Sequence, residues 1–87
     1  MQNLPTLRQM QYLLALAEHR NFSKAAEACN VTQSTLSGAL REMETILRAD
    51  VVDRSSHKGV HFTPLGENIL KSAHGIIAQM EDITYRA

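Results

Sequence analysis

Apolar and polar positions in the first part of the chain alternate with the spacing of an amphipathic helix. Between residues 7 and 19 the apolar side chains recur every three or four positions and form one broad face. The Thr6 hydroxyl can accept a hydrogen bond from a free N–H group of the first turn and so cap this helix. The pattern predicts a helix from Leu7 to His19.

Two more helices and a turn are predicted next. Ser23 is a favourable N-cap for a short alanine-rich helix over residues 24–29. Residues 30–31 indicate a turn, and Thr32 then caps a longer helix over residues 33–47. The inner face of the longer helix consists of Leu36, Ala39, Leu40, Met43 and Leu47. Two helices joined by a turn of about four residues are the helix-turn-helix signature.

The periodicity changes after residue 48. Two short β-prone pieces, residues 51–52 and 60–62, flank a polar segment and predict a small hairpin. The hairpin would form a wing beside the helix-turn-helix, with its exposed part at residues 54–60.

A last helix is predicted from Pro64 to about residue 86, with Thr63 as its N-cap. Gly66 and Gly75 weaken it by about 1 kcal/mol each relative to alanine. The predicted fold class is therefore mainly α: a winged helix-turn-helix with a three-helix core, a small β-hairpin wing and a long C-terminal helix.

Composition limits the alternatives. Eighty-seven residues allow one small domain, and with 5% aromatic residues the core must be mostly aliphatic. The longest apolar runs are far shorter than the roughly 20 residues of a membrane span, and no signal peptide is visible, so we expect no membrane partner. A single cysteine excludes an internal disulfide framework and a cysteine-cluster zinc site, and a cytoplasmic location is the default expectation.

The charge of the chain gives no clear indication for or against DNA binding. Nine basic residues balance nine acidic ones, whereas a DNA-binding protein usually shows a basic footprint. Arg54, His57 and Lys58 nevertheless place local positive charge in the predicted wing, where they could contact phosphates or the minor groove. The alternative is that they form only a solvated turn.

The start of the helix over residues 33–47 carries the main functional signal. Its small, polar, uncharged residues are Thr32, Gln33, Ser34, Thr35, Ser37 and Gly38. Recognition helices read bases near their N-terminal end, where glutamine can pair with adenine and serine or threonine can serve several bases. The alternative is a solvated surface with Thr32 as a mere cap. The small side chains of Ala25 and Ala26, which allow close helix packing, favour the DNA interpretation.

Arg41 and Cys29 each allow two interpretations. Arg41 lies two turns along the same helix and could contact a phosphate or form a surface pair with Glu42 or Glu44. Cys29 could be a redox switch, but a buried structural thiol is the stronger hypothesis. No arrangement of histidines, carboxylates or nucleophiles indicates a metal site, a cofactor site or an enzyme.

The last helix carries a second apolar stripe with alternating steps of four and three, typical of a coiled-coil seam. The seam residues are Ile69, Ala73, Ile76, Met80 and Ile83, and Leu65 completes the expected dimer interface. The flanking residues Leu70 and Ile77 can pack on the first helix while the seam meets a second copy. The alternative is that both stripes serve the domain's own core. Two-fold pairing would present two recognition helices to a pseudo-palindromic site.

Several of these residues together resemble a known family. The segments that carry the resemblance are Phe22–Glu27, Val31–Gln33, Leu36-Ser37, Leu40, Glu44, Arg54, Val60, Phe62-Thr63 and Gly66. In these positions the chain resembles the N-terminal domain of LysR-type transcriptional regulators. Residues 15–20, 29 and 35–38 further resemble the peroxide-sensing subfamily. The chain departs from the family pattern at Ser34, at residues 48–49, at residues 51–54 and at Gly59.

The resemblance implies roles for individual residues. Gln33, Ser34 and Ser37 fall where the family reads bases, and Thr35 and Arg41 fall near backbone contacts. His57 or Lys58 falls where a wing residue enters the minor groove. Ser23, Thr32, Gly38 and Arg54 complete the set of expected DNA-binding residues.

The resemblance also implies partners and organisation. Residues 1–63 would form the DNA-binding domain and residues 64–87 the dimerisation helix, with a bacterial, nucleoid-associated location. Family members carry an effector-binding domain beyond this helix, which is not in this chain, and a tetramer would need it. The main alternative is a helical protein-interaction module that dimerises through the last helix without binding DNA, which the net charge of zero favours.

Overall fold

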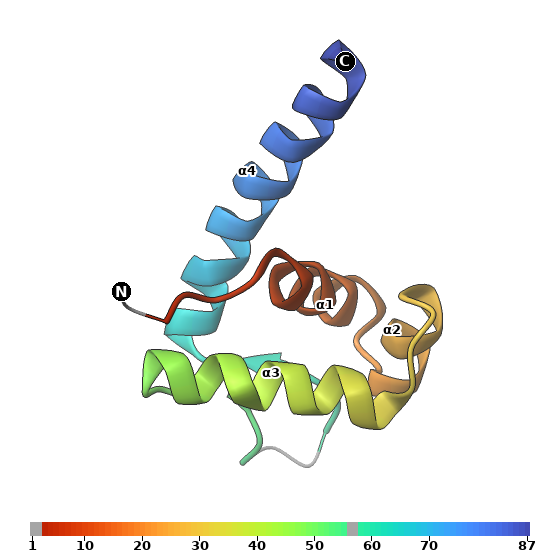
Figure 1. Cartoon of the computed structure of the whole chain (residues 1–87). Coiled ribbons are helices and arrows are strands. Elements are labelled where there is room, and N and C mark those ends of the chain that lie inside the picture. The colour runs from red at the N-terminus through yellow and green to blue at the C-terminus, as the bar shows by residue number, and fades with distance from the viewer. Residues whose placement is uncertain (1–2, 56–57) are drawn as a thin grey trace.

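Three helices and a small hairpin form the head of the molecule, and a long helix projects from it (Figure 1). The computed structural model describes residues 3–55 and 58–87. Within these residues the elements are α1 (Leu7–His19), α2 (Phe22–Ala28), α3 (Gln33–Leu47), β1 (Val52–Asp53), β2 (His61–Phe62) and α4 (Pro64–Arg86). The predicted mainly α winged helix-turn-helix is confirmed.

Side-chain caps fix where the helices begin. Thr6 Oγ1 accepts from the Gln9 N–H at 3.1 Å, and Gln9 Oε1 accepts from the Thr6 N–H at 2.9 Å, forming a capping box. Thr32 and Thr63 cap α3 and α4 as predicted, with Pro64 in the first turn of α4. Each cap satisfies N–H groups that have no partner inside the helix.

The predicted cap of α2 is wrong. Asn21, not Ser23, is the N-cap, and its Oδ1 accepts from the Lys24 N–H at 2.9 Å. The helix therefore begins at Phe22 and ends at Ala28, with Cys29 as its C-cap. The physical reason is that Asn21 holds the extended backbone an N-cap needs, with φ −157° and ψ 124°. Ser23 consequently lies inside the first turn, and its hydroxyl is used elsewhere.

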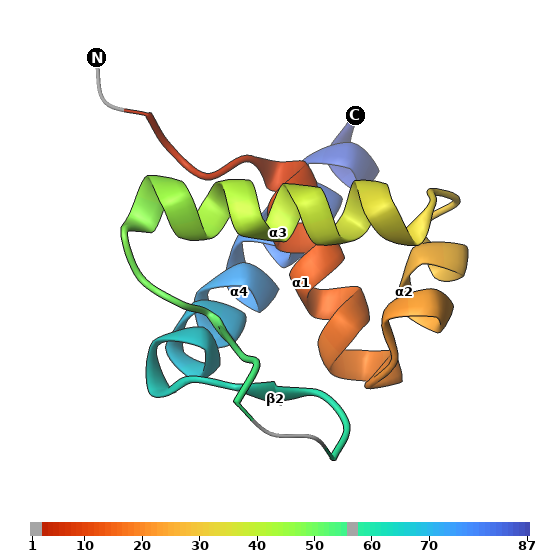
Figure 2. The same ribbon diagram turned by 90° about the horizontal axis from the view of Figure 1, so that it is seen from below.

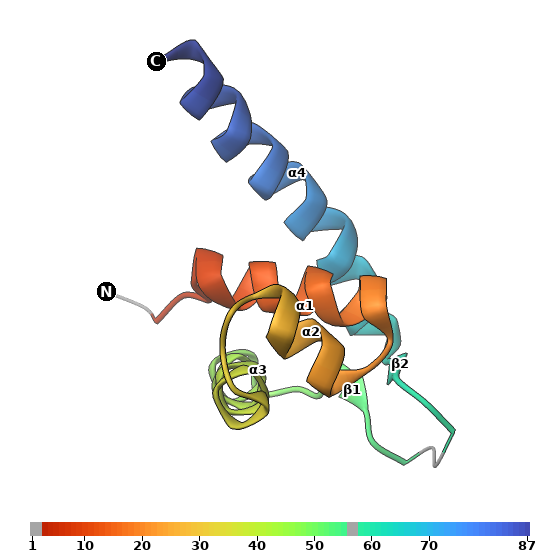
Figure 3. The same ribbon diagram turned by 90° about the vertical axis from the view of Figure 1, so that its right-hand side faces the viewer.

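The helix-turn-helix is built from α2 and α3, which lie side by side at one end of the head (Figure 2 and Figure 3). Ala25 and Ala26 are buried, and their small side chains allow α2 to approach the rest of the core closely. Asn30 turns the chain with a left-handed φ of 57°, and the Val31 N–H donates to the Ala26 carbonyl at 3.0 Å. The turn therefore fixes the start of α3 relative to α2.

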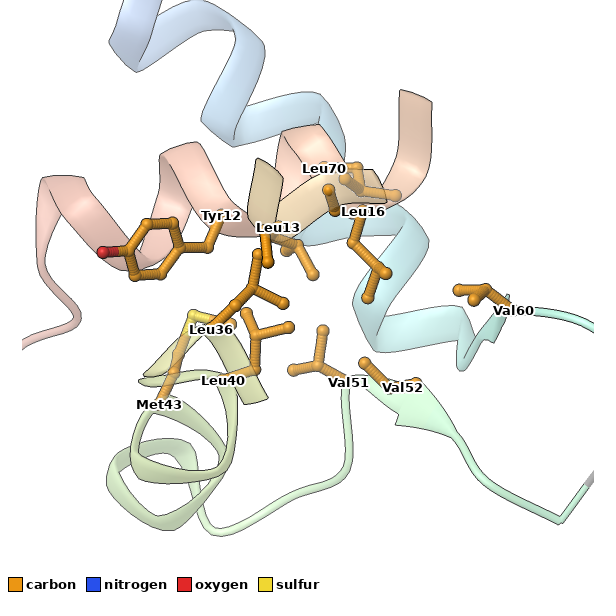
Figure 4. Packing of buried hydrophobic residues seen from close by; sticks show 12 residues of the cluster. Tyr12, Leu13, Leu16, Leu36, Leu40, Met43, Val51, Val52, Val60 and Leu70 are labelled. Carbon is orange, nitrogen blue, oxygen red and sulfur yellow. The ribbon is translucent and has the colours of Figure 1, made fainter. Parts of the chain in front are cut away.

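The core is almost entirely aliphatic, as the composition predicted (Figure 4). Leu13 and Leu16 of α1 meet Leu36, Leu40 and Met43 of α3, and all are fully buried. The remaining members come from α1, α2, β1, α4 and the residues next to the two strands: Tyr12, Ala25, Ala26, Val51, Val52, Val60 and Leu70. One continuous core thus joins the hairpin and α4 to the helix-turn-helix.

The hairpin is anchored on α1 by the residue that ends this helix. In its antiparallel register Val52 pairs with Phe62. Arg20 Nη1 donates to the Val60 carbonyl at 2.9 Å, and its guanidinium lies 5.2 Å from the centroid of the Phe62 ring. Arg20 therefore connects the end of α1 to the second strand.

The two halves of α4 have different surroundings. In the first half, Leu70 and Ala73 are buried against the head, whereas the second half extends away from it (Figure 1). At Gly66 the helix approaches the Val51 carbonyl so closely that a Cβ atom would collide with it. Gly66 therefore does more than weaken the helix, because it allows α4 to dock on the hairpin.

Candidate nucleic-acid interface

The first turns of α3 carry a small polar surface, called the reading surface here. It consists of Thr32, Gln33, Ser34, Thr35, Ser37 and Gly38, none of them charged. All are exposed except Ser37, which is half-buried. In Figure 1, α3 and the hairpin lie at the lower side of the head, away from the projecting end of α4. The structure thus brings together the residues predicted to read bases.

Hydrogen bonds order the reading surface. Thr32 Oγ1 accepts from the Thr35 N–H at 3.1 Å and donates to Thr35 Oγ1 at 2.9 Å. Ser23 Oγ donates to Gln33 Oε1 at 2.8 Å. Thr35 Oγ1 and Gln33 Oε1 are the acceptors of the bonds from Thr32 and Ser23. The Thr35 hydroxyl proton and the Gln33 Nε2 protons are therefore left for a partner.

The N-terminus of α3 adds donors from the backbone. Gln33 and Ser34 are the first helical residues, so their N–H groups have no carbonyl acceptor within the helix. Such groups, together with the helix dipole, favour a phosphate oxygen. The same short surface therefore offers donors for a phosphate and for base edges.

Gly38 leaves an opening in this surface. It lies inside α3, and a Cβ built on it meets no atom of the chain within 4 Å. Internal packing therefore does not require glycine here, although glycine weakens a helix interior by about 1 kcal/mol relative to alanine. An opening of this kind suits close approach by a partner.

Arg41 is exposed on α3, beyond the reading surface. The alternative of a surface pair with Glu42 or Glu44 is not observed among residues 3–55 and 58–87. Glu44 is instead buried and bonded elsewhere. The geometry leaves Arg41 able to contact a phosphate.

The buried carboxylate of Glu44 ties the hairpin to α3, which the sequence analysis missed. It accepts from the Val51 N–H at 2.8 Å, from the Val52 N–H at 3.1 Å and from Arg54 Nη1 at 2.9 Å. Burial opposes its ionisation, but these donors and the Arg54 charge outweigh that effect and hold the pKa of Glu44 below its ordinary value. A signal was present, because Glu44 lies four positions after the buried Leu40, and a buried carboxylate needs partners.

Of the three wing residues expected to contact DNA, the structure describes Arg54 and Lys58. Arg54, expected to contact DNA, has its Nη1 on Glu44, so its first role is to hold the hairpin. His57 lies outside the described residues. Lys58 is exposed, and its carbonyl oxygen lies 2.6 Å from His61 Nε2. Gly59 turns the chain with φ 74°, a conformation that suits glycine.

Cys29 occupies a structural position. It is half-buried at the end of α2 and packs against the core. Burial raises the pKa of its thiol, with a smaller opposing effect from the Arg8 charge. This environment keeps the thiol protonated and favours the structural interpretation over a redox switch.

The predicted seam on α4 is only partly exposed. Leu65, Ile76, Met80 and Ile83 are exposed, with 45% of Ile76 accessible, and Ile69 is half-buried against the core. Ala73 is fully buried within the protomer, which corrects its assignment to the exposed seam. Like Leu70, it lies in the half of α4 that packs on the head, where α4 contacts α1.

The N-terminal segment extends this apolar face. Leu4, which is 71% exposed, and Leu7 line an open groove of about 500 Å³ together with Ile76 and Met80. The remaining lining residues are Pro5, Thr6 and Met10. Only Ile76 and Met80 of this groove were predicted to lie at an interface, because the other lining residues precede or belong to α1. Among the described residues no helix could span a membrane, and no cluster of metal-ligating side chains is present.

Comparison with known proteins places this geometry in a family. The family model for bacterial regulatory helix-turn-helix proteins of the lysR family matches residues 7–67. The chain is 42% identical over 80 residues to the HTH-type transcriptional regulator EstR of Acinetobacter baylyi, covering 92% of the chain and 26% of EstR. It is 40% identical over 75 residues to the hydrogen peroxide-inducible genes activator of Pectobacterium carotovorum, covering 86% of the chain and 24% of that protein. The chain thus spans about a quarter of the length of these relatives.

Solved structures agree with the sequence relatives. An OxyR mutant of Corynebacterium glutamicum superimposes with a TM-score of 0.90 at 32% identity, over 98% of this chain and 27% of that one. DarR of Vibrio fischeri, solved in complex with DNA, superimposes with a TM-score of 0.86 at 34% identity, over 97% of this chain and 28% of that one. The similarity to peroxide-responsive regulators confirms that resemblance, and the similarity to EstR extends it to other members. The chain belongs to the LysR family of bacterial regulatory helix-turn-helix proteins.

Proposed function

We propose that this chain binds double-stranded DNA as a homodimer, with α3 in the major groove. The observation that carries the proposal is the ordered, uncharged reading surface at the N-terminus of α3. Gln33 Oε1 and Thr35 Oγ1 are engaged as acceptors within the protein, while the Gln33 Nε2 protons and the Thr35 hydroxyl proton remain for a partner. The similar regulator DarR was solved in complex with DNA, which supports DNA as the partner of this chain.

Specificity and affinity come from different residues in this proposal. Gln33, Ser34 and Ser37 read base edges, and Gly38 lets the groove approach α3. Thr35 and Arg41 contact the phosphate backbone, and Thr32 holds the Thr35 hydroxyl in place for this contact. Lys58 and His57 of the wing reach the minor groove, and Arg54 supports them from its place on Glu44.

Dimerisation supplies the second half-site. The exposed residues Leu65, Ile76, Met80 and Ile83 of α4 would meet a second copy, with Ile69 at the edge. Residues 1–63 would act as the DNA-binding domain and residues 64–87 as the dimerisation helix. A dimer presents two copies of α3 to a pseudo-palindromic site, so modest contacts in each half-site add up.

The wider setting follows from the family. The matched relatives are transcriptional regulators about three and a half times the length of this chain. We infer that the full protein is a cytoplasmic regulator acting at the bacterial nucleoid and not an enzyme. A further effector-binding domain would supply the signal and any tetramer.

A salt titration tests the proposal. Binding of the chain to a random duplex, followed by fluorescence anisotropy, should weaken as salt rises, because phosphate contacts release counterions. The expected slope of log affinity against log salt is about −0.9 for each phosphate neutralised. Arg41→Ala should make the slope shallower by about one per subunit, and Glu42→Gln is the matched control on the same helix. No binding at low salt, or binding that ignores salt, would leave the protein-interaction module as the better interpretation.

A further inference from the structure

A hydrogen bond joins the two helices of the helix-turn-helix at the reading surface. Ser23 lies in the first turn of α2 and Gln33 is the first residue of α3. Ser23 Oγ donates to Gln33 Oε1 at 2.8 Å, across ten residues of sequence. Ala25 and Leu36, close to these two residues along their helices, are fully buried. The Ser23 hydroxyl therefore has a fixed position relative to the α3 backbone.

This bond engages the Oε1 end of the Gln33 amide. A glutamine amide has an acceptor end and a donor end of nearly the same shape, so an unrestrained amide presents either end to a partner. With Oε1 held by Ser23, Nε2 is the end that remains to donate. Oε1 keeps one further lone pair, since a carbonyl oxygen can accept two hydrogen bonds.

The fixed polarity selects among bases. In the major groove guanine offers N7 and O6 as acceptors, adenine offers N7 and thymine offers O4. Cytosine offers only its N4 donor and therefore no partner for Nε2. Adenine suits both ends of the amide, because its N6 donor can use the remaining lone pair of Oε1.

We propose that Ser23 is a positioning residue for base recognition: it holds Gln33 so that Nε2 donates to an acceptor-bearing base and cytosine is rejected. This inference rests on the proposed function. It also revises the expectation that Ser23 contacts DNA directly. A phosphate oxygen only accepts hydrogen bonds, and the one proton of the Ser23 hydroxyl is already donated to Gln33.

A double-mutant cycle tests the proposal. Base selection from a random duplex pool with the unmodified chain first locates the position that Gln33→Ala makes indifferent. Binding is then measured on duplexes that differ only there. The unmodified chain should prefer the selected base over cytosine by about tenfold. Ser23→Ala should remove most of this preference and leave affinity for random duplex unchanged, whereas Ser23→Thr, which keeps the hydroxyl, should retain it.

The Gln33→Ala background decides how Ser23 acts. There, Ser23→Ala should change nothing further, because the group it positions is absent. An equal loss of affinity on every duplex, in both backgrounds, would mean that the hydroxyl contacts DNA itself and would overturn the proposal. An unchanged base preference in Ser23→Ala would overturn it too.

A measurement without DNA separates this inference from the proposed function. In the free chain, the side-chain amide protons of Gln33 should shift in the NMR spectrum on Ser23→Ala, and those of Gln79 on α4 serve as the control. Equal spectra would sink the positioning role even if the chain binds DNA. If the unmodified chain binds no duplex at any salt concentration, the proposed function fails and this inference fails with it.

Discussion

The Glu44 carboxylate and the Arg54 guanidinium form an ion pair that joins α3 to the wing. Arg54 Nη1 lies 2.9 Å from Glu44 Oε1 and 3.0 Å from Oε2, and the side chain of Glu44 is 8% exposed. The same carboxylate accepts the N–H groups of Val51 and Val52. One side chain of α3 thus sets where the chain leaves this helix and where the wing begins.

Glu44→Gln should destabilise the fold. The amide keeps the size of the side chain but loses its charge, and its NH₂ group cannot accept from the donors that face it. Since a hydrogen bond to a charged group contributes about 1.5–3 kcal/mol, the expected loss of unfolding free energy is about 2–3 kcal/mol. Urea unfolding measures it. Glu42→Gln, on the exposed face of α3, should stay within about 0.5 kcal/mol of the unmodified chain.

The same carboxylate should make stability depend on acid. Its folded pKa lies below the unfolded value of about 4.3, so its contribution is complete above that pH and is lost as pH falls through the folded pKa. Unfolding free energies of the unmodified chain and of Glu44→Gln should therefore differ most above about pH 5 and converge as the pH falls through the lowered folded pKa. Parallel curves over this range would contradict the ionised state of Glu44.

Features that depend on residues close together in the sequence could be predicted, whereas contacts between residues far apart in the sequence could not. Local patterns predicted the helices and the Thr6, Thr32 and Thr63 caps, because periodicity and capping act within a few residues. The same local reasoning chose Ser23 as a cap, since it could not foresee that Gln33 would engage the hydroxyl. Contacts made across the fold, such as Glu44 with the hairpin, needed the structure.

The reading surface shows the same division. Its members all lie between residues 32 and 38 and were predicted together, whereas the hydrogen bond that engages Gln33 depends on α2 packing against α3. The exposed apolar face of α4 was predicted less completely. Leu4 and Leu7, from the other end of the chain, line a groove with Ile76 and Met80, and Ala73 does not belong to the exposed face because it is buried.

Two arginines in the same left-handed conformation should respond oppositely to replacement by glycine. Arg48 ends α3 with φ 55° and has an exposed side chain, whereas Arg20 ends α1 with φ 52° and holds Val60 and Phe62. Left-handed backbone costs a non-glycine residue about 1–2 kcal/mol, and glycine loses about 0.5–1 kcal/mol in backbone entropy. Arg48→Gly should therefore stabilise the chain by about 0.5–1 kcal/mol.

Arg20→Gly should destabilise the chain by about 1–2 kcal/mol, because the lost hydrogen bond to Val60 and the contact with Phe62 exceed the relief of strain. Thermal unfolding followed by circular dichroism compares the two variants directly. A gain of stability in Arg20→Gly would mean that its contacts with the hairpin contribute little.

Ile76→Asp should prevent dimerisation. Ile76 is exposed on the protomer and lines the groove with Leu4 and Met80, so a carboxylate there would be buried without a partner in the dimer. Sedimentation equilibrium should give a monomer whose circular dichroism still shows a folded head. Ala78→Asp, about 200° around the helix from Ile76, should remain dimeric. Equal masses for both variants would remove the proposed face.

Gly38→Ala should raise the stability of the chain and weaken its binding to DNA. A Cβ on either Gly38 or Gly75 meets no atom within 4 Å, and both residues lie inside helices. Replacement of either by alanine should therefore raise the unfolding free energy by about 0.5–1 kcal/mol.

The two variants should differ in their affinity for DNA. Gly38→Ala places a methyl group between α3 and the groove and should weaken binding by about tenfold, or about 1.4 kcal/mol, whereas Gly75→Ala should bind like the unmodified chain. If Gly38→Ala gained stability and kept full affinity, the groove would not approach α3 at this position, and Gln33 and Ser37 would have to reach the bases from farther away.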